Sequence, residues 1–157
     1  MVAHPIQKAS RPASLYDADF HRWTQQQGRA LRERHPSDID WENVAEEIET
    51  LGRTEKSEIA SRLNVLLVHL LKWQFQSEDR SNSWRGSVVE QRRKLQHLLK
   101  ENPSLRSYPE EIGAEEYEIA RLKAAGETGL PLEHFPEGLP YTIAEILSDS
   151  FYPGEEN

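Results

Sequence analysis

The sequence predicts an all-α fold, a single-domain bundle of four to five main helices wrapped by a proline-rich C-terminal segment. Apolar residues recur at steps of three and four along most of the chain, which is helical spacing. No segment of adequate length alternates at period two, as a half-buried strand would. The most apolar stretch, Leu63–Phe75, holds Leu, Val, Trp or Phe at nine of thirteen positions. A helix with so apolar a circumference must be covered on several sides, which makes it the predicted centre of the bundle.

Length and composition limit the class of protein. The 157 residues fit one domain, expected over residues 14–153, with a disordered lead-in at 1–13 and a disordered tail at 154–157. The lead-in has no apolar core and so is not a signal peptide. The central stretch is shorter than the ~20 residues that span a membrane, so no membrane segment is expected. Cysteine is absent, which excludes disulfides and thiolate chemistry and fits a cytoplasmic protein.

The first half of the chain predicts two helices before the central one. Ser14 is expected to cap a helix that stops near His35–Pro36 and that lines one side with apolar and amide side chains: Tyr16, Phe20, Trp23, Gln27 and Leu31. Ser37 or Asp38 opens the second, whose expected buried face is Trp41, Val44, Ala45, Ile48 and Leu51. Gly52 can end this helix or hinge it, so residues 41–76 form either one kinked helix or two.

The second half predicts two more long helices. Ser81 or Asn82 caps a helix that ends at Asn102–Pro103 and carries a seam of Trp84, Val88, Gln91, Leu95, Leu98 and Leu99. Pro109 suits the first turn of the next helix, whose small residues would allow close approach to a neighbour. From Leu130 onward, prolines indicate a wrapping segment with one short helix near residues 142–147.

One polar cluster is the candidate site. It joins residues from three predicted helices: Glu46, Glu47, His69, Lys72, Arg85 and Arg92. The structural interpretation is an ion-pair network that sets helix register, because a carboxylate at a seam needs a partner and an arginine fork provides one. The functional interpretation is a polar cleft that binds a small ligand. The sequence leaves both open.

Other kinds of site have less support. The six histidines form no H-x-x-x-H pair, and neither Glu46 nor Glu47 has a histidine three residues on, so no metal or other cofactor is expected. There is no nucleophile elbow and no phosphate-binding glycine loop. The basic residues Arg85, Arg92, Arg93, Lys94 and Lys100 crowd one helix, yet they form no single stripe, and the net charge of −8 disfavours nucleic acid.

Several fragments fall in a familiar order. They include Leu15-Tyr16-x-x-Asp19-Phe20-x-x-Trp23, Asp40-Trp41-x-x-x-x-Glu46-Glu47-Ile48-x-x-Leu51-Gly52, His69-Leu70-Leu71-Lys72-Trp73, Ser83-Trp84-Arg85, Pro103-Ser104-Leu105, Pro140-Tyr141-Thr142 and Phe151-Tyr152-Pro153. Over roughly residues 14–153 the chain resembles the bacterial family catalogued as domain of unknown function twenty-nine. The resemblance implies a small all-helical bacterial protein and implies no activity.

Three functions are therefore considered. The first is a non-enzymatic interaction or regulatory protein of the bacterial cytosol with an unidentified protein partner, which predicts an apolar patch left uncovered by the bundle. The second is a small-molecule binder or enzyme that uses a polar cleft between helices, with Glu47, His69 and Arg92. The third is binding of RNA or single-stranded nucleic acid. The sequence does not decide the oligomeric state.

Overall fold

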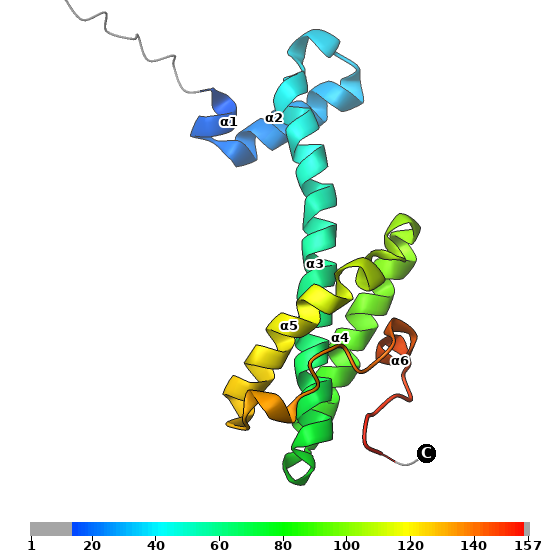
Figure 1. The fold of residues 1–157 in the computed structure, drawn as a ribbon. Helices are drawn as coiled ribbons and strands as arrows, with labels where there is room; N and C mark the ends of the chain where they lie inside the picture. Colours follow the sequence, from blue (N-terminus) through cyan, green and yellow to red (C-terminus); the bar gives the residue numbers. More distant parts are fainter. Residues whose placement is uncertain (1–13, 156–157) are drawn as a thin grey trace, which may run out of the picture. The chain divides into compact units, whose positions relative to one another are not determined.

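The computed structural model describes residues 14–155, and within that range it contains helices and no strand. The predicted lead-in at 1–13 lies outside the described residues, as do the last two residues of the predicted tail. The all-α prediction is confirmed. The six α-helices of the described range are α1 (Leu15–Ala18), α2 (Phe20–Glu33), α3 (Trp41–Phe75), α4 (Asn82–Glu101), α5 (Tyr108–Thr128) and α6 (Ile143–Leu147) (Figure 1). Short 3-10 turns lie at Pro36–Asp38, Ser77–Asp79, Pro103–Leu105 and Leu132–His134.

The chain divides into two compact units. The first ends at Leu51 and the second begins at Gly52. This boundary falls inside α3, which is a single helix by its hydrogen bonding from Trp41 to Phe75. The open question of one helix or two is thus answered in favour of one, although Gly52 does mark a change of packing unit. Each unit is described separately below.

The first unit corrects the prediction of one helix from Ser14 to His35. The backbone leaves the helical region at Asp19 (φ −152°, ψ 85°), so α1 and α2 are separate. The side chain of Asp19 accepts a hydrogen bond from the amide of Arg22 at 3.0 Å. Aspartate is among the best N-capping residues because its short carboxylate reaches the unpaired amides of the first turn. Asp19 therefore starts a new helix where the apolar spacing alone predicts a continuous one.

Polar contacts close the turn between α2 and α3. The indole Nε1 of Trp23 donates to the Asp40 carboxylate at 3.2 Å. The side-chain amide of Gln27 donates to the carbonyl of Asp38 at 3.2 Å and accepts from the backbone amide of Asp40 at 2.7 Å. Trp23, Gln27 and Ala30 are the buried residues of α2. The side of α2 that faces α3 is therefore held largely by hydrogen bonds to the turn.

Several apolar residues of the first unit are exposed, and three of them, Trp41, Ile48 and Leu51, were expected in a buried face. Their exposed fractions are 48% for Phe20, 45% for Leu31, 60% for Trp41, 64% for Ile48 and 67% for Leu51. The spacing correctly predicted that the apolar side chains of this part of α3 lie on one side of the helix. The expectation of burial is wrong because no helix of the first unit lies across from it.

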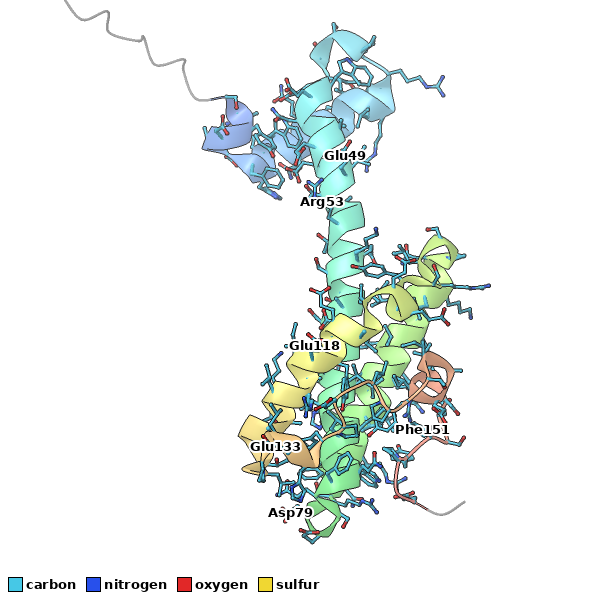
Figure 2. All side chains as sticks on the ribbon, in the orientation of Figure 1. Glu49, Arg53, Asp79, Glu118, Glu133 and Phe151 are labelled. Atoms are coloured by element: carbon cyan, nitrogen blue, oxygen red, sulfur yellow. The ribbon has the colours of Figure 1, made fainter. Side chains whose placement is uncertain are left out.

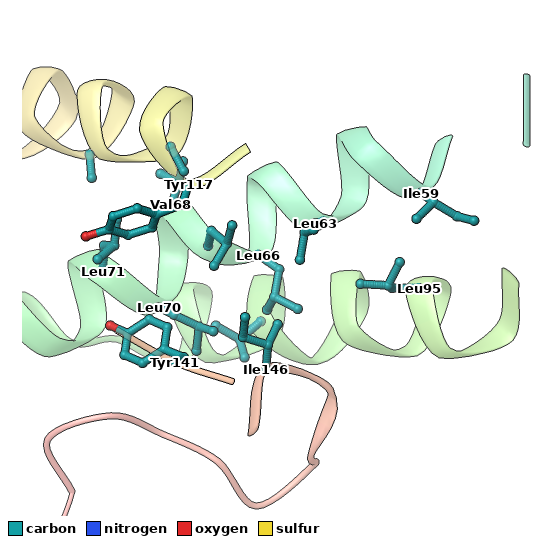
Figure 3. Packing of buried hydrophobic residues seen from close by; sticks show 14 of the residues in the cluster. Ile59, Leu63, Leu66, Val68, Leu70, Leu71, Leu95, Tyr117, Tyr141 and Ile146 are labelled. Atoms are coloured by element: carbon teal, nitrogen blue, oxygen red, sulfur yellow. The ribbon is translucent and has the colours of Figure 1, made fainter. Parts of the chain in front are cut away.

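The second unit contains the main apolar core, and the predicted central stretch lies in it. Ile59 and Leu63 of α3 face Leu95 of α4, and Tyr117 of α5 lies beside Val68 (Figure 3). All five side chains are buried. Asn64 is a buried polar residue of α3; its side-chain amide donates to the carbonyl of Glu116 at 3.2 Å and accepts from Lys123 Nζ at 2.8 Å, which ties α3 to α5.

The predicted start of α4 and the small residues of α5 are confirmed. The Ser81 hydroxyl caps α4 by accepting from the amide of Trp84 at 3.2 Å. Gly113 is buried, and a β-carbon there would lie 3.3 Å from the Cδ1 of Ile143. The absence of a side chain lets the C-terminal segment approach α5 closely. Helix α5 ends at Gly129, whose φ of 72° suits glycine.

The predicted C-terminal wrap is also confirmed. Residues from Leu130 onward form one short helix, α6, which Thr142 and Glu145 start with a reciprocal capping box. Tyr141 and Ile146 are buried in the core of the second unit. The segment that carries Phe151 then runs on beyond α6 (Figure 2). No helix of the described chain is both long and apolar enough to cross a membrane.

Candidate functional site

The six residues of the predicted polar cluster fall into different environments. Glu46 and Glu47 belong to the part of α3 in the first unit, and the other four belong to the second. The Tyr16 hydroxyl donates to Oε1 of Glu47 at 2.5 Å. This hydrogen bond raises the pKa of Tyr16 to about 12, because it favours the neutral phenol beside a carboxylate. Glu47 therefore fastens α1 to α3.

Arg92 is buried, yet its partners are backbone carbonyls and not the carboxylate that the structural interpretation proposed. Its Nε donates to the carbonyl of Ile146 at 2.9 Å, one terminal nitrogen to that of Phe151 at 2.8 Å, and the other to that of Asp149 at 3.4 Å. Burial lowers the pKa of the guanidinium. A planar fork of donors suits three convergent carbonyls. Arg92 is thus the clasp that holds residues 146–151 against α4.

Arg85 belongs to a stack of arginines and aromatic rings. Its guanidinium carbon lies 4.5 Å from the centre of the Tyr152 ring and 5.1 Å from that of Trp73. Arg80 lies 5.2 Å from the Trp73 ring and donates to the Trp73 carbonyl at 2.8 Å. Each such contact contributes about 0.5–2 kcal/mol. Arg80 and Tyr152 were not predicted from the sequence, although Tyr152 lies in one of the fragments that carry the family resemblance.

A shallow pocket of about 480 Å³ lies next to this stack, where α4 begins. Its lining includes Trp73, Arg80, Arg85 and Glu155. Arg85 also forms an ion pair with Glu155 at 3.4 Å, with both side chains well exposed. Arg85 contacts Tyr152 and Glu155 of the C-terminal segment, while Arg80 binds Trp73, so the stack is first of all a packing device.

Lys72 and His69 lie one turn apart on α3. Lys72 Nζ pairs with Glu127 at 2.9 Å and lies 4.7 Å from the centre of the Trp84 ring. His69 is half-buried, and its Nδ1 is buried without a hydrogen-bond partner in the described structure. Burial lowers the pKa of His69, and the positive charge of Lys72 lowers it further. The imidazole is therefore neutral at pH 7, and the structure gives it no hydrogen bond to Arg92.

The basic residues of α4 are largely occupied. Lys94 pairs with Glu90 at 2.5 Å, while Arg92 and Arg85 hold the C-terminal segment as described. Of the predicted set, Arg93 and Lys100 are exposed, and neither forms an ion pair among residues 14–155. A nucleic-acid surface needs several free cations along one track, and α4 does not offer that track. Within the same residues, no three His, Asp or Glu side chains lie close enough together to hold a metal ion.

One surface feature that these contacts leave unexplained is apolar. Trp41, Ile48 and Leu51 are exposed on one face of α3 in the first unit, and we call these three residues the α3 apolar face. Large exposed side chains at helical spacing mark interaction sites more often than single scattered ones do. The sequence identified this face but assigned it to the core. No signal within this segment could have corrected the assignment, because burial depends on whether another element covers the face.

The comparisons with known proteins place the whole described chain in one family. A family model with the description "Domain of unknown function DUF29" matches residues 15–152. No curated protein and no solved structure matches the chain significantly.

Proposed function

The chain belongs to the family Domain of unknown function DUF29, and from its structure we propose that it is a non-enzymatic interaction protein of the bacterial cytosol. In this proposal the second unit is a scaffold and the first unit binds a protein. The observation that carries the proposal is the α3 apolar face, with exposed fractions of 60–67% at Trp41, Ile48 and Leu51. Burying one such side chain contributes about 1.5–3 kcal/mol, so their exposure in the isolated chain favours a bound state.

The composition of the second unit supports the same proposal. The polar residues that sequence reasoning considered for a ligand site are used there to attach chain segments: Arg92 binds carbonyls, Lys72 pairs with Glu127, and Asn64 bridges to α5. A side chain that already holds internal partners has less to offer a ligand. These contacts weigh for the structural interpretation of Arg92 and against the alternative of a polar cleft.

Site-specific photo-crosslinking in the native host tests the proposal. A benzoylphenylalanine placed at Ile48 should give discrete cross-linked protein products, because the residue lies in the bound face. The matched control is the same photo-crosslinker at Leu122, a 61% exposed side chain of α5 in the second unit. Equal labelling at both positions, or none at Ile48, would count against a specific interaction through the α3 apolar face.

A further inference from the structure

The shallow pocket at the start of α4 brings two guanidinium groups together. It is lined by Trp73, Arg80, Ser81, Asn82, Arg85 and Glu155. The guanidinium carbons of Arg80 and Arg85 lie 5.2 and 5.1 Å from the centre of the Trp73 ring, so one indole supports both cations. Two like charges held this close together favour an anion as a shared partner.

Both guanidinium groups keep donors that the described chain does not use. Arg80 donates through its Nε to the carbonyl of Trp73, and its terminal nitrogens make no hydrogen bond within residues 14–155. Arg85 makes one hydrogen bond there, from a terminal nitrogen to Oε1 of Glu155 at 3.4 Å, which is long for a contact between charged groups. The planar forks of the two side chains are therefore still open to oxygen acceptors.

The start of α4 adds backbone donors to the same pocket. The Ser81 hydroxyl accepts from the amide of Trp84, whereas the amides of Asn82 and Ser83 in the first turn have no acceptor among the described residues. Helix α4 has 20 residues, and a helix of that length carries a partial positive charge at its N-terminus. Unpaired amides and this partial charge together favour anions such as phosphate.

A buried donor in the wall of the pocket also lacks a partner. Trp73 is 3% exposed, and its indole Nε1 has no hydrogen-bond acceptor in the described structure. Buried polar groups of proteins are nearly always paired, and each exception needs an explanation. Because Trp73 lines the pocket, an acceptor bound there explains this one.

Glu155 indicates the charge of the ligand. It is the acidic member of the six lining residues, and its carboxylate pairs with Arg85 at 3.4 Å while both side chains stay well exposed. Exposed pairs of this kind contribute little to stability. Glu155 is thus a weak internal anion that leaves the donors of Arg80, Trp73 and the helix start unused, and a stronger anion can displace it.

We propose that this pocket binds the phosphate group of a small phosphorylated molecule, and that Glu155 competes with the phosphate for Arg85. A phosphate monoester carries about −1.5 to −2 charges at pH 7 and three terminal oxygens, so it can accept from both arginine forks and from the helix start. A carboxylate has one charge and two oxygens. The volume of about 480 Å³ lies within the ~300–1,000 Å³ of small-molecule sites. The inference does not depend on the role proposed for the α3 apolar face.

A titration of the full chain with glycerol 3-phosphate, followed by ¹H–¹⁵N NMR at pH 7.5 and constant ionic strength, tests the site. The indole N–H of Trp73, assigned from the spectrum of Trp73→Phe, should shift with saturation, as should the amides of Asn82 and Ser83. Acetate should bind at least about tenfold more weakly, because it offers fewer charges and oxygens. Absence of saturable shifts at these three groups, or equal binding of acetate, overturns the inference.

Two arginine variants test the role of the guanidinium fork. Arg85→Lys keeps the charge but should weaken binding of glycerol 3-phosphate at least about tenfold, because an ammonium group cannot donate to two phosphate oxygens side by side. The matched control is Arg93→Lys, at an exposed arginine of α4 that does not line this pocket, and it should leave the dissociation constant unchanged. Equal effects of the two variants overturn the site.

Removal of the competing carboxylate should have the opposite effect. Glu155→Gln should tighten binding of glycerol 3-phosphate about threefold or more, since Arg85 then loses its internal anion. Glu101→Gln removes an exposed carboxylate at the other end of α4 and should change nothing. Equal effects of these variants overturn the competition. A phosphoserine peptide that binds much more tightly than glycerol 3-phosphate overturns the assignment to a small molecule.

Discussion

Replacement of Arg92 by methionine should loosen the C-terminal segment. Methionine keeps an unbranched apolar stem in the buried channel but removes every donor that reaches Ile146, Asp149 and Phe151. Hydrogen bonds from a charged group contribute about 1.5–3 kcal/mol each, so the two short ones at 2.9 and 2.8 Å are worth roughly 3–6 kcal/mol together. The third, at 3.4 Å, adds little.

Two effects reduce that gross value. Removing the guanidinium abolishes the cost of burying a charge, which is the cause of its lowered pKa. Water can also reach the carbonyl of Asp149, an exposed residue. We therefore expect Arg92→Met to lower the free energy of unfolding by about 2–4 kcal/mol, which for a chain of this size lowers Tm by roughly 5–15 °C.

Urea denaturation and hydrogen exchange measured by mass spectrometry check this expectation. Amides of residues 143–153 should exchange faster in Arg92→Met, with α5 affected less. Arg92→Lys should recover only part of the loss, because an ammonium cannot reach three carbonyls that a planar fork reaches together. Arg93→Met, at the exposed neighbouring position, should stay within about 0.5 kcal/mol of the wild type. Unchanged stability and unchanged exchange in Arg92→Met would refute the role of Arg92 as a clasp.

Three further perturbations are accessible. The lowered pKa of His69 means that the unfolded chain binds a proton first as the pH falls, so folding stability should decline from about pH 6.5 downward. His69→Gln should remove part of this decline in urea melts at pH 7.5 and 5, and identical pH dependence in His69→Gln and wild type would contradict the assignment. Tyr16 should titrate at about pH 12, because it donates to Glu47; its neutral form stabilises the fold below pH 10, and that contribution is lost as the pH rises to 12. The tyrosinate absorbance of wild type minus Tyr16→Phe should show one group titrating there, and a midpoint near 10 would argue against the hydrogen bond. Asn64→Leu should cost about 1–3 kcal/mol by leaving polar groups of α5 without partners, and a neutral effect in chemical denaturation would show that water replaces it fully.

The sequence predicts most of the second unit because local signals there agree with tertiary packing. The apolar run at Leu63–Phe75, the cap at Ser81 and the short helix near residues 142–147 each lie where the sequence predicts them. The small residues near Gly113 meet a close neighbour as expected. Agreement of this kind between local preference and packing is typical of segments whose structure can be read from a single sequence.

The first unit shows that the spacing of apolar residues predicts neither their burial nor every break in a helix. A helical wheel identifies Trp41, Ile48 and Leu51 as one face, but burial depends on whether another helix is available to cover it. The break at Asp19 depends on a capping hydrogen bond that competes with an otherwise continuous apolar spacing. In both cases the observed structure depends on contacts outside the regular apolar spacing. The sequence pattern of one segment shows its local helical preference but not the contacts that the rest of the fold provides.

The polar residues were predicted from the sequence, but the partners that they contact in the structure differ from the predicted ones. Arg92 was expected to pair with a carboxylate, and its acceptors are instead three main-chain carbonyls. The acceptors are carbonyls more than fifty positions away in the sequence, and carbonyls carry no residue identity that a pattern could reveal. The role of the cluster as a site remains a prediction that neither the fold nor the family decides.

The clasp made by Arg92 has a consequence for how the C-terminal segment can vary. Because the guanidinium binds main-chain oxygens, the side chain of Ser150 can be exchanged without loss of these hydrogen bonds. The number of residues between Ile146 and Phe151 is constrained, because one inserted or deleted residue would move the carbonyls away from the N–H donors of Arg92. The segment should therefore tolerate amino-acid substitutions but not changes of length. Surface loops, in contrast, usually tolerate insertions and deletions.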